Sequence, residues 1–480
     1  MTIHHYLRLV IETQSPMAIN SGGRETGFDT ELARDANGLP YIPATAIAGV
    51  WRHLAAKQLD ANTLNGFFGT TDASSVLSIS DGVVHNSRNQ PMRGLLPESA
   101  ITGDPLLSLL ADARPLHRER VAINDRGVAK DTGKFDQILL PAGLRFSIDF
   151  AFRPRDNSGL AEDAWHGLLS LWQDRGFCLG STTRNGLGQI RVIASETLKL
   201  DLATGPESGK KLQGFRTSVR SPEKLDIKFS QAAHTHLLAS LPLKALDNWR
   251  CGTGSVLLGQ HNVDRVDMLT YSEPRITWKN GQGILGRPKP ILCGSSIKGI
   301  LAHRVAFHYR RRRGIWAEDM ADAANDQWET RPDALHALFG HAEDEKNDQK
   351  GAAGQLYVDD CTVNYTQTVV RQHNSIDRFT GGVRKGALYN EELLYQPEFV
   401  VKVWLRSGTT LPESLKLALE DTFNDLKTGL LPMGAGSGRG ASLVIPALSA
   451  GGWQVHADLI NTVADAPLPE TQPAMEEACQ

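Results

Sequence analysis

The chain has 480 residues, of which 41% are hydrophobic and 22% are charged, a globular balance that at this length predicts two or more domains. Its 51 Lys and Arg residues stand against 54 Asp and Glu residues, so the net charge of −3 makes any nucleic-acid surface a local feature rather than a property of the whole chain. The 5 cysteines are scattered without a CxxC pair, which argues against structural zinc and against a disulfide framework.

The N-terminal residues MTIHHYLRLVIETQS lack the basic segment and the long apolar run of a secretory signal. The sequence also lacks a run of about 18 apolar residues, which a membrane-spanning helix would need. Together with the sparse cysteines, these features predict a cytoplasmic protein.

Six landmarks occur twice along the chain in the same order, which predicts a duplicated domain. They are a helix start, a Phe-Gly motif, a strand ending in acid, a polar loop, an apolar strand and a glycine-rich closing loop. The pairs are YIPATAIAGVW (41–51) and ILCGSSIKGIL (291–301), GFFG (66–69) and ALFG (337–340), VLSISDG (76–82) and GQLYVDDC (354–361), VAINDRG (121–127) and NSIDRFTGG (374–382), ILLPAGLRFSIDFAF (138–152) and ELLYQPEFVVKVWL (392–405), and LGSTTRNGLGQI (179–190) and MGAGSGRGASLV (433–444).

These landmarks place a first domain at residues 1–200 and a second at residues 232–455. Residues 201–231 are polar and carry Gly and Pro, which is typical of a linker. Residues 456–480 are acidic and Pro-rich, which is typical of a mobile tail.

In chain order, each copy opens with a strand, predicted by alternating polarity over residues 4–12 and 234–243. A helix follows, and Thr45 and Ser295 are the expected N-caps because a hydroxyl can accept from an early helical N–H. Further strands, a second amphipathic helix and a last strand complete the copy. This order is that of a ferredoxin-like α+β sandwich with long inserted loops, an architecture that also serves single-stranded RNA recognition.

The segments GFDTELARDANGLPYIPATAIAGVWR (27–52) and ILCGSSIKG (291–299), together with the glycine-rich closing loops, resemble the RAMP superfamily of CRISPR proteins. The similarity is to the repeating backbone subunits of type III effector complexes, here two fused in tandem. It implies two ferredoxin-like RAMP domains, each with an inserted thumb hairpin. It further implies that guide RNA, complementary target RNA and other effector subunits are the partners. In such complexes base pairing supplies sequence specificity, while the protein contacts backbone and shape.

Asp29 occupies the position of the family's catalytic aspartate, so the resemblance implies cleavage of target RNA at the first domain. A carboxylate there could orient the attacking 2′-hydroxyl, accept its proton or hold a divalent metal such as Mg²⁺. The alternative is an Asp that bonds its own backbone in a loop turn. Asp35 matches a second acid of the family loop, but it stands in a turn sequence.

The second copy departs from this pattern, with Ser272 and Trp278 aligned to the two acids of the first copy. Asp267 and Glu273 lie nearby and are candidates for the missing carboxylate. We expect the second domain to bind RNA and to cut poorly.

The resemblance assigns RNA contacts to basic thumb residues, to residues of the first helix and to the closing glycines, which permit close approach to phosphates. Ordinary exposed loops and tight turns are the alternative readings. The basic run at 308–314 is expected to be a solvated helix end. The candidate RNA-binding residues are Arg52, Arg118, Arg120, Arg126, Lys130, Lys298, Arg304, Arg371, His373, Arg378, Arg384, Gly186, Gly188, Gly438 and Gly440.

Three other functions compete with target cleavage. A catalytically inactive RNA-binding backbone subunit would need neither Asp29 nor a metal. A guide-processing ribonuclease would need a His or Tyr acid-base cluster, and none stands out. A nucleotide-binding enzyme is disfavoured because no glycine fingerprint follows a strand.

Overall fold

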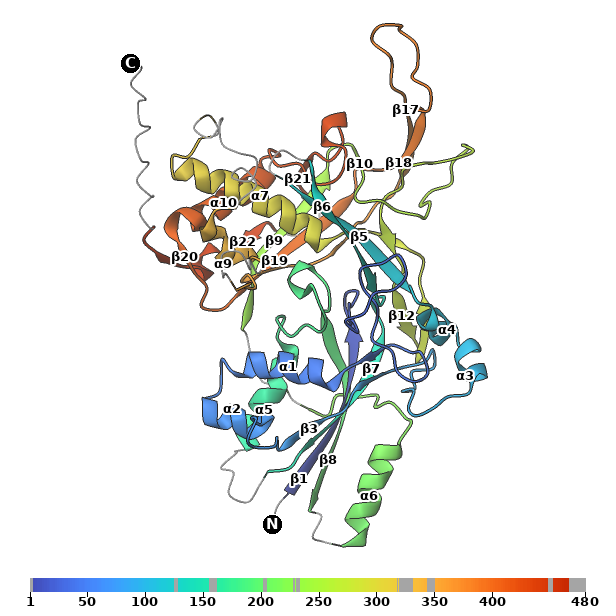
Figure 1. The fold of residues 1–480 in the computed structure, drawn as a ribbon, viewed down its shortest axis with the longest axis vertical. Coiled ribbons are helices and arrows are strands. Elements are labelled where there is room, and N and C mark those ends of the chain that lie inside the picture. The colour runs from blue at the N-terminus through green and yellow to red at the C-terminus, as the bar shows by residue number, and fades with distance from the viewer. Residues whose placement is uncertain are drawn as a thin grey trace, which may run out of the picture.

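The computed structural model contains two domains of mixed helix and strand, the first below the second in Figure 1. This confirms the predicted α+β class and the tandem arrangement. The described residues are 3–124, 128–154, 162–201, 205–227, 229, 234–316, 318, 331–342, 350–447 and 452–465.

The first domain is built on a six-stranded sheet in the order β2-β4-β7-β1-β8, with β3 also paired to β7. A separate antiparallel hairpin, β5–β6, rises from this domain towards the second (Figure 1). The elements are β1 (Ile3–Thr13), β2 (Tyr41–Ile42), α1 (Ala44–Ala55), α2 (Ala61–Phe68), β3 (Leu77–Ile79), β4 (Gly82–Val84), α3 (Glu98–Thr102), α4 (Pro105–Ala111), β5 (Leu116–Ile123), β6 (Ala129–Leu139), β7 (Arg145–Phe152), α5 (Glu162–Ser170) and β8 (Ile190–Asp201).

The second domain is built on a five-stranded sheet in the order β15-β19-β9-β21, with β22 also paired to β9. Its hairpin β17–β18 projects away from the first domain (Figure 1). The elements are β9 (Thr235–Ala245), β10 (Asn248–Trp249), β11 (Ser272–Glu273), β12 (Ile276–Lys279), β13 (Gln282–Leu285), β14 (Lys289–Leu292), α7 (Gly294–Arg312), α9 (His336–Phe339), β15 (Leu356–Val358), β16 (Cys361–Thr362), β17 (Thr368–His373), β18 (Tyr389–Tyr395), β19 (Glu398–Arg406), β20 (Thr410–Pro412), α10 (Glu413–Lys427), β21 (Val444–Pro446), β22 (Gln454–Val455) and β23 (Asn461–Val463).

The two sheets share one topology. The strand order β3-β7-β1-β8 of the first domain corresponds to β15-β19-β9-β21 of the second. In each domain a helix follows the strand that comes first along the chain, α1 after β1 and α7 after β9. A second helix precedes the strand that comes last, α5 before β8 and α10 before β21. The first helix is longer in the second copy, since α7 has 19 residues and α1 has 12. The repeated landmarks therefore mark a true duplication of the fold.

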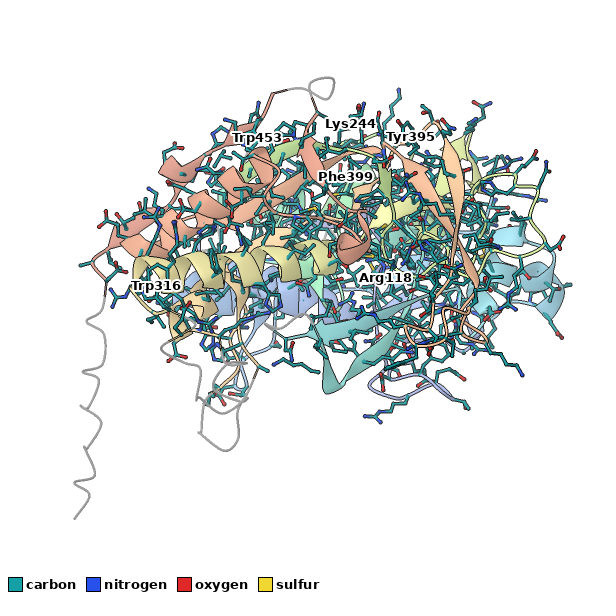
Figure 2. The ribbon with its side chains drawn as sticks, turned by 90° about the horizontal axis from the view of Figure 1, so that it is seen from above. Arg118, Lys244, Trp316, Tyr395, Phe399 and Trp453 are labelled. Atoms are coloured by element: carbon teal, nitrogen blue, oxygen red, sulfur yellow. The ribbon has the colours of Figure 1, made fainter. Side chains whose placement is uncertain are left out.

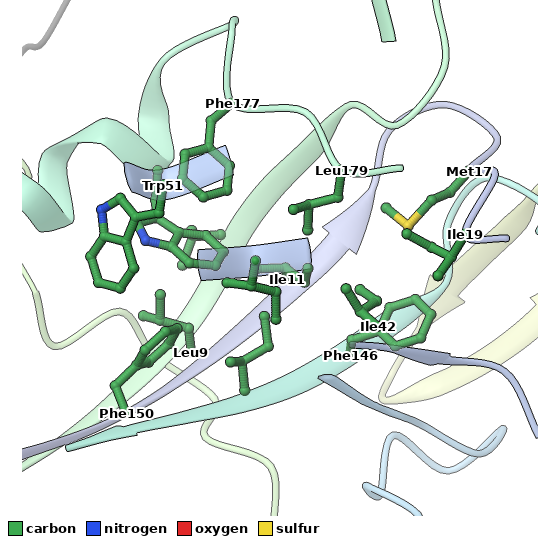
Figure 3. Packing of buried hydrophobic residues seen from close by; sticks show 14 of the residues in the cluster. Leu9, Ile11, Met17, Ile19, Ile42, Trp51, Phe146, Phe150, Phe177 and Leu179 are labelled. Atoms are coloured by element: carbon green, nitrogen blue, oxygen red, sulfur yellow. The ribbon is translucent and has the colours of Figure 1, made fainter. Parts of the chain in front are cut away.

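The core of the first domain forms where α1 packs on the sheet (Figure 3). Trp51 of α1 is fully buried, lies edge-on to Phe150 at 5.4 Å and to Trp172 at 5.6 Å between ring centroids, and donates its indole N–H to the Leu168 carbonyl at 2.8 Å. Aromatic burial with a satisfied N–H is strongly stabilising. Figure 3 shows Leu9 facing this cluster from β1.

The expected N-caps Thr45 and Ser295 are wrong, because neither helix start has a side-chain cap from its own segment. A distant carboxylate replaces them. Asp81 accepts the Ala44 N–H at 2.7 Å, and in the second domain Asp360 accepts the corresponding N–H of α7 at 2.7 Å. Tertiary contacts thus satisfy donors that the local sequence leaves open.

Two segments outside the predicted domains carry structure. The linker contains α6 (Pro206–Thr217), whose Phe215 packs against Tyr6 of β1. The segment predicted as a tail contains a short 3-10 helix (Ala457–Leu459) and then β23, which pairs in parallel with β20. The second domain therefore extends past the predicted boundary at 455, at least to the end of that strand.

Candidate nucleic-acid interface

Asp29 lies in an exposed loop that rests on the first hairpin. Its Oδ2 accepts the Asp136 N–H of β6 at 3.0 Å, and the neighbouring Thr30 hydroxyl accepts the Ile138 N–H at 2.9 Å. The Phe28 ring lies edge-on to His117 of β5 at 5.7 Å. These contacts fix the position of an accessible carboxylate beside the hairpin, as a group that acts on a bound strand would require.

Asp267 has the same setting on the second hairpin. Its Oδ2 accepts the Asn390 N–H of β18 at 3.0 Å, and the Met268 carbonyl accepts the Glu392 N–H at 2.9 Å. The two pairs of contacts therefore occur with the same spacing along β6 and β18. One difference is that Arg265 pairs with Asp267, with 2.6 Å between Nε and Oδ1.

Backbone pairing corrects the predicted alignment of Ser272 with Asp29. Ser272 pairs with Pro290, whereas in the first domain it is Arg34 that bridges the equivalent Pro40. Ser272 therefore corresponds to Arg34, and Asp267 is the structural counterpart of Asp29. The predicted alignment failed because the segment after Ser272 is longer than its counterpart, since it holds β12 and β13 before Pro290, whereas Arg34 is followed by a short turn to Pro40.

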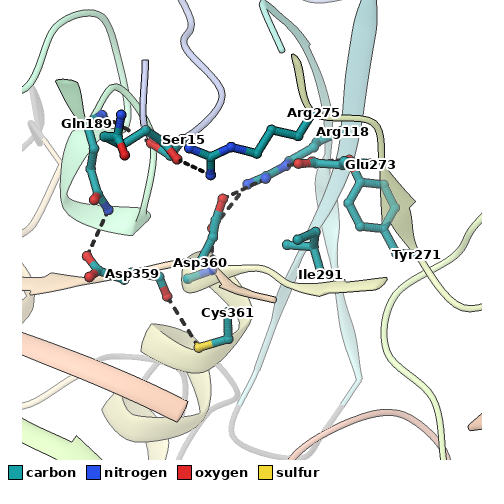
Figure 4. Close-up of polar contacts among 12 residues, drawn as sticks. Ser15, Arg118, Gln189, Tyr271, Glu273, Arg275, Ile291, Asp359, Asp360 and Cys361 are labelled. Atoms are coloured by element: carbon teal, nitrogen blue, oxygen red, sulfur yellow. Dashed lines mark hydrogen bonds and ion pairs between the residues drawn. The ribbon is translucent and has the colours of Figure 1, made fainter. Parts of the chain in front are cut away.

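Arg118 was predicted to hold phosphate, and this is wrong. Its side chain is 2% exposed and pairs with Glu273 at 2.5 Å and with Asp360 at 2.6 Å, both in the second domain (Figure 4). Burial opposes its charge, but Asp360, with Cys293 and Glu273, outweighs burial and holds the pKa of the guanidinium above its usual range. Figure 2 shows Arg118 in the middle of the molecule. It is an inter-domain anchor.

Glu273 is likewise excluded as a substitute catalytic acid, since it is 6% exposed and accepts from both Arg118 and the Tyr271 hydroxyl. Arg120, two residues along the hairpin, remains compatible with an anion. Its Nε and Nη2 have no hydrogen-bond partner within the described structure. Burial, followed by repulsion from Arg118, lowers the pKa of Arg120.

Lys298 lines a pocket of about 350 Å³ at the junction of the two domains. Arg184 from the first domain and His341 from the second lie in the same wall. Burial, followed by repulsion from Arg184 and Arg331, lowers the pKa of Lys298 to about 8. Cationic side chains from both domains therefore lie close together here, and a bound anion would reduce the repulsion between them.

The closing glycines divide into two groups. Gly186 (φ +99°) faces Asp360 so closely that a Cβ would lie 2.9 Å from its backbone nitrogen, and Gly188 (φ +71°) packs on the Leu179 carbonyl. Close approach to protein accounts for these two, in place of the predicted contact with RNA. Gly438 and Gly440 have nothing within 4 Å of the Cβ position among the described atoms and stay open to a ligand.

The far end of the second hairpin carries exposed apolar and basic side chains together. Phe379 is 99% exposed and Val383 is 59% exposed. Arg378 and Arg384 are exposed beside them, and Arg384 lies 3.9 Å from Asp377. Apolar tips flanked by cations suit a segment that separates stacked bases while holding phosphates.

The far end of the first hairpin also carries exposed apolar side chains, since Val121 is 48%, Ile123 50% and Val128 59% exposed. Lys130 is half-buried on β6, where it makes a contact of its own. Arg126 falls outside the described residues.

Several predicted cations have protein partners. Arg52 donates to the Gly69 carbonyl at 2.7 Å and to Asn65 at 2.8 Å. His373 stacks on Tyr389 at 4.9 Å. The remaining pairs are Arg304 with Asp425, Arg371 with Asp247, and Arg311 and Arg312 of the basic run with Asp421.

Arg304, Arg311 and Arg312 therefore stabilise the packing of α7 on α10, whereas the sequence predicted a solvated helix end for the basic run.

Sequence reasoning missed Arg184 and the carboxylate pair Asp81 and Asp360. Arg184 donates to the Gly354 carbonyl of the second domain at 2.6 Å, from the middle of the first closing loop. The signal for the carboxylates was present, because both acids end the third repeated landmark.

The described residues contain no group of three or more His, Cys, Asp or Glu side chains arranged to hold a metal. None of the helices in this part of the chain is both long and apolar enough to cross a lipid bilayer.

The sequence model of the RAMP superfamily matches residues 10–191 and 243–444, one stretch in each domain. A cryo-EM structure of the type III-B Cmr-beta bound to cognate target RNA is similar with a TM-score of 0.28 and 14% identity. That match covers 41% of this chain and 61% of the other, so less than two thirds of the other chain is spanned. No curated protein matches the sequence.

Proposed function

The chain belongs to the RAMP superfamily, and on that premise we propose that it is a guide-RNA-binding subunit of a type III CRISPR effector that cuts complementary target RNA. The cut expected at the first domain depends on Asp29. The geometry of Asp267 extends the proposal to a second cut at the second domain, in place of the poor cutting expected from the sequence alone.

One observation carries this proposal: in each domain the carboxylate of an exposed Asp accepts a backbone N–H of the second strand of the hairpin. The next residue accepts the N–H two positions along, through a hydroxyl in the first domain and a carbonyl in the second. In the first domain Asp29 is an exposed residue, and among the described residues its carboxylate has one hydrogen bond, to a backbone N–H. In the second domain Asp267 shares its second oxygen with Arg265, which is itself 83% exposed and can move aside.

Such a carboxylate suits attack by a 2′-hydroxyl on the adjacent phosphate. The hydroxyl must lie in line with the leaving oxygen, and a fixed acceptor can orient it or take its proton. A divalent metal such as Mg²⁺ fits as well, because Mg²⁺ commonly uses one or two carboxylates together with waters and phosphates. Asp29 would be its protein ligand, and the metal would supply charge stabilisation at the phosphate.

The apolar hairpin ends support the same reading. A guide–target duplex laid across both domains would meet Val128 on one hairpin and Phe379 on the other, and either could wedge between bases. The anion-accepting pocket with Lys298 and Arg184 would hold a backbone phosphate between the domains.

The test is cleavage of end-labelled complementary RNA by the effector complex assembled with this chain. Asp29→Ala is expected to remove one product and Asp267→Ala another, each with target binding intact. Asp72→Ala, an exposed loop acid of the first domain, is the control and should leave both cuts. Two unchanged cuts in the Asp29→Ala, Asp267→Ala double variant would refute the assignment of both carboxylates.

An inactive RNA-binding backbone subunit is the second candidate. The pairing of Arg265 with Asp267 favours it for the second domain, because an ion pair lowers the availability of the carboxylate. Loss of one product in Asp29→Ala with no change in Asp267→Ala would assign cutting to the first domain and a binding role to the second.

A further inference from the structure

We propose that His261 and Glu392 form a proton-transfer pair in the second domain, with His261 as the base that activates the target RNA. This inference rests on the proposed function and names the chemistry of the cut proposed for the second domain. The two residues are 131 positions apart in the sequence, so no local motif joins them. They meet beside Asp267, on the strand β18 that also anchors that aspartate.

Glu392 is a fully buried carboxylate surrounded by hydrogen-bond donors. Its Oε1 accepts the Gly259 N–H at 2.8 Å and lies 2.8 Å from Nε2 of His261, and its Oε2 accepts the Leu258 N–H at 3.0 Å. Because an ionised carboxylate only accepts hydrogen bonds, Nε2 of His261 carries the proton. A buried carboxylate in this position fixes the orientation of the ring and stabilises the imidazolium that forms when the ring takes up a second proton.

His261 is held at one ring nitrogen and open at the other. Oγ1 of Thr368 lies 3.3 Å from the same Nε2, and the His261 side chain is 11% exposed. Within the described residues no hydrogen bond is made to Nδ1. The neutral ring therefore presents an unprotonated nitrogen, Nδ1, as a general base requires.

The backbone beside the ring leaves room for this contact. A Cβ on Gly259 would lie 2.7 Å from Nε2 of His261 and 2.0 Å from Oγ1 of Thr368. A side chain at position 259 would therefore displace the ring from Glu392. The loop accommodates the imidazole because this residue is a glycine.

The pair shares one face of β18 with the anchor of Asp267. Alternate residues of a strand point to the same face, so Asn390 and Glu392 are neighbours there, about 7 Å apart at about 3.4 Å per residue. The Asn390 side chain donates to the Arg265 carbonyl at 2.8 Å, and its backbone N–H is accepted by Asp267 at 3.0 Å. The loop between is thus fastened to this face at both ends, by Glu392 and by Asn390, which brings His261 to the same surface as Asp267.

In the first domain the position of Glu392 is taken by Ile138. Both residues stand two positions after the one whose N–H the aspartate accepts, and the Ile138 side chain is buried in the core. The two cuts should therefore use different bases, the carboxylate in the first domain and the imidazole in the second. Asp267, which lies 2.6 Å from Arg265, then needs only to orient the hydroxyl that His261 deprotonates.

The step balances without a further reactant. Nδ1 of His261 takes the proton of the 2′-hydroxyl, the 2′-oxygen bonds to phosphorus, and the bond between phosphorus and the 5′-oxygen breaks. The leaving oxygen takes a proton from water, and the imidazolium returns its proton to the solvent. The products are a 2′,3′-cyclic phosphate and a 5′-hydroxyl end. Arg265, which is 83% exposed, supplies a cation for the phosphate.

The titratable groups around His261 come from β18, from the segment before β17 and from its own loop. Glu392 contacts the ring, and Tyr365 lies beside Glu392, since burial followed by the charge of Glu392 raises the pKa of Tyr365. Histidine is the residue type in this set whose charge changes near neutral pH. The charged residues of the loop are Asp264, Arg265 and Asp267.

The test is the pH dependence of both cuts, measured on end-labelled complementary RNA with the assembled effector complex. In the wild type the rate of the second cut should rise with pH as the imidazole loses its proton, and then level off. His261→Gln should lower that rate at least about a hundredfold and remove the rise, because general base catalysis contributes about 10²–10⁴. Glu392→Gln should move the midpoint of the rise to lower pH, because the buried negative charge no longer favours the imidazolium.

The first cut is the internal reference and should keep its rate and profile in each variant. His456→Gln is the matched control, because it makes the same change at an exposed histidine of the same domain, and it should leave both cuts as they are. Circular dichroism should show every variant folded, and target binding should stay at the wild-type level.

A second cut that keeps its wild-type rate and pH profile in His261→Gln would overturn the proposal, while the assignment of Asp267 would stand. An unchanged midpoint in Glu392→Gln would overturn the pairing of the two residues as a proton-transfer unit. A wild-type complex that makes no second cut at any pH would instead refute the proposed cleavage at the second domain, and this inference with it.

Discussion

Removing Arg118 should destabilise the protein through the contact between its domains. Its guanidinium binds Glu273 at 2.5 Å and Asp360 at 2.6 Å, and the three side chains are 2%, 5% and 9% exposed. Arg118→Ala would leave two buried carboxylates without a cation, a change that costs about 3–5 kcal/mol in comparable buried pairs. At roughly 2–4 °C per kcal/mol for a domain of this size, the melting temperature should fall by roughly 6–20 °C.

Differential scanning calorimetry of the full-length protein is the appropriate assay, since two domains need not unfold in one step. The transition of the second domain should move most and separate from that of the first, because the stranded acids Glu273 and Asp360 both belong to it. Limited proteolysis should show faster cleavage between the domains.

Two further variants sharpen this prediction. Lys134→Ala on the same hairpin breaks a surface pair with Glu119, 60% and 54% exposed, and should shift the transition by less than about 2 °C. Arg118→Met combined with Glu273→Gln and Asp360→Asn should recover most of the loss, because no charge is then left unpaired. A shift for Arg118→Ala no larger than that for Lys134→Ala would refute the reasoning.

Three other outcomes are expected. The pKa of Lys298 is lowered to about 8, so the lysine is charged below that pH and neutral above it. The affinity for single-stranded RNA in fluorescence titrations should therefore fall between about pH 7 and about pH 9. Lys298→Ala should remove that part of the pH dependence. Gly186→Ala should lower the melting temperature more than Gly440→Ala, because both add strain at positive φ but only the first also meets Asp360. Asp104→Ala should cost about 1–2 kcal/mol in thermal unfolding, since its carboxylate caps α4.

The duplication, the α+β class and the loop setting of Asp29 could be predicted from the sequence alone. These follow from local patterns: helix starts, Phe-Gly turns and glycine-rich loops recur in order, and each is encoded within a few residues. The resemblance to RAMP proteins rests on the same segments. That Asp29 lies in a loop follows from its local sequence, whereas its position beside the hairpin depends on β6, 107 residues away.

The availability of the predicted cations and the identity of the acid that matches Asp29 depend on the tertiary structure. Arg118 reads as a basic loop residue, yet its partners Glu273 and Asp360 lie 155 and 242 positions away, and no local pattern reports a contact at that separation. The match of Asp267 to Asp29 was set by hydrogen bonds to the hairpins, across loops of unequal length. Strand pairing determines which residues of the two domains occupy equivalent positions, whereas the sequence gives only the order of residues along the chain.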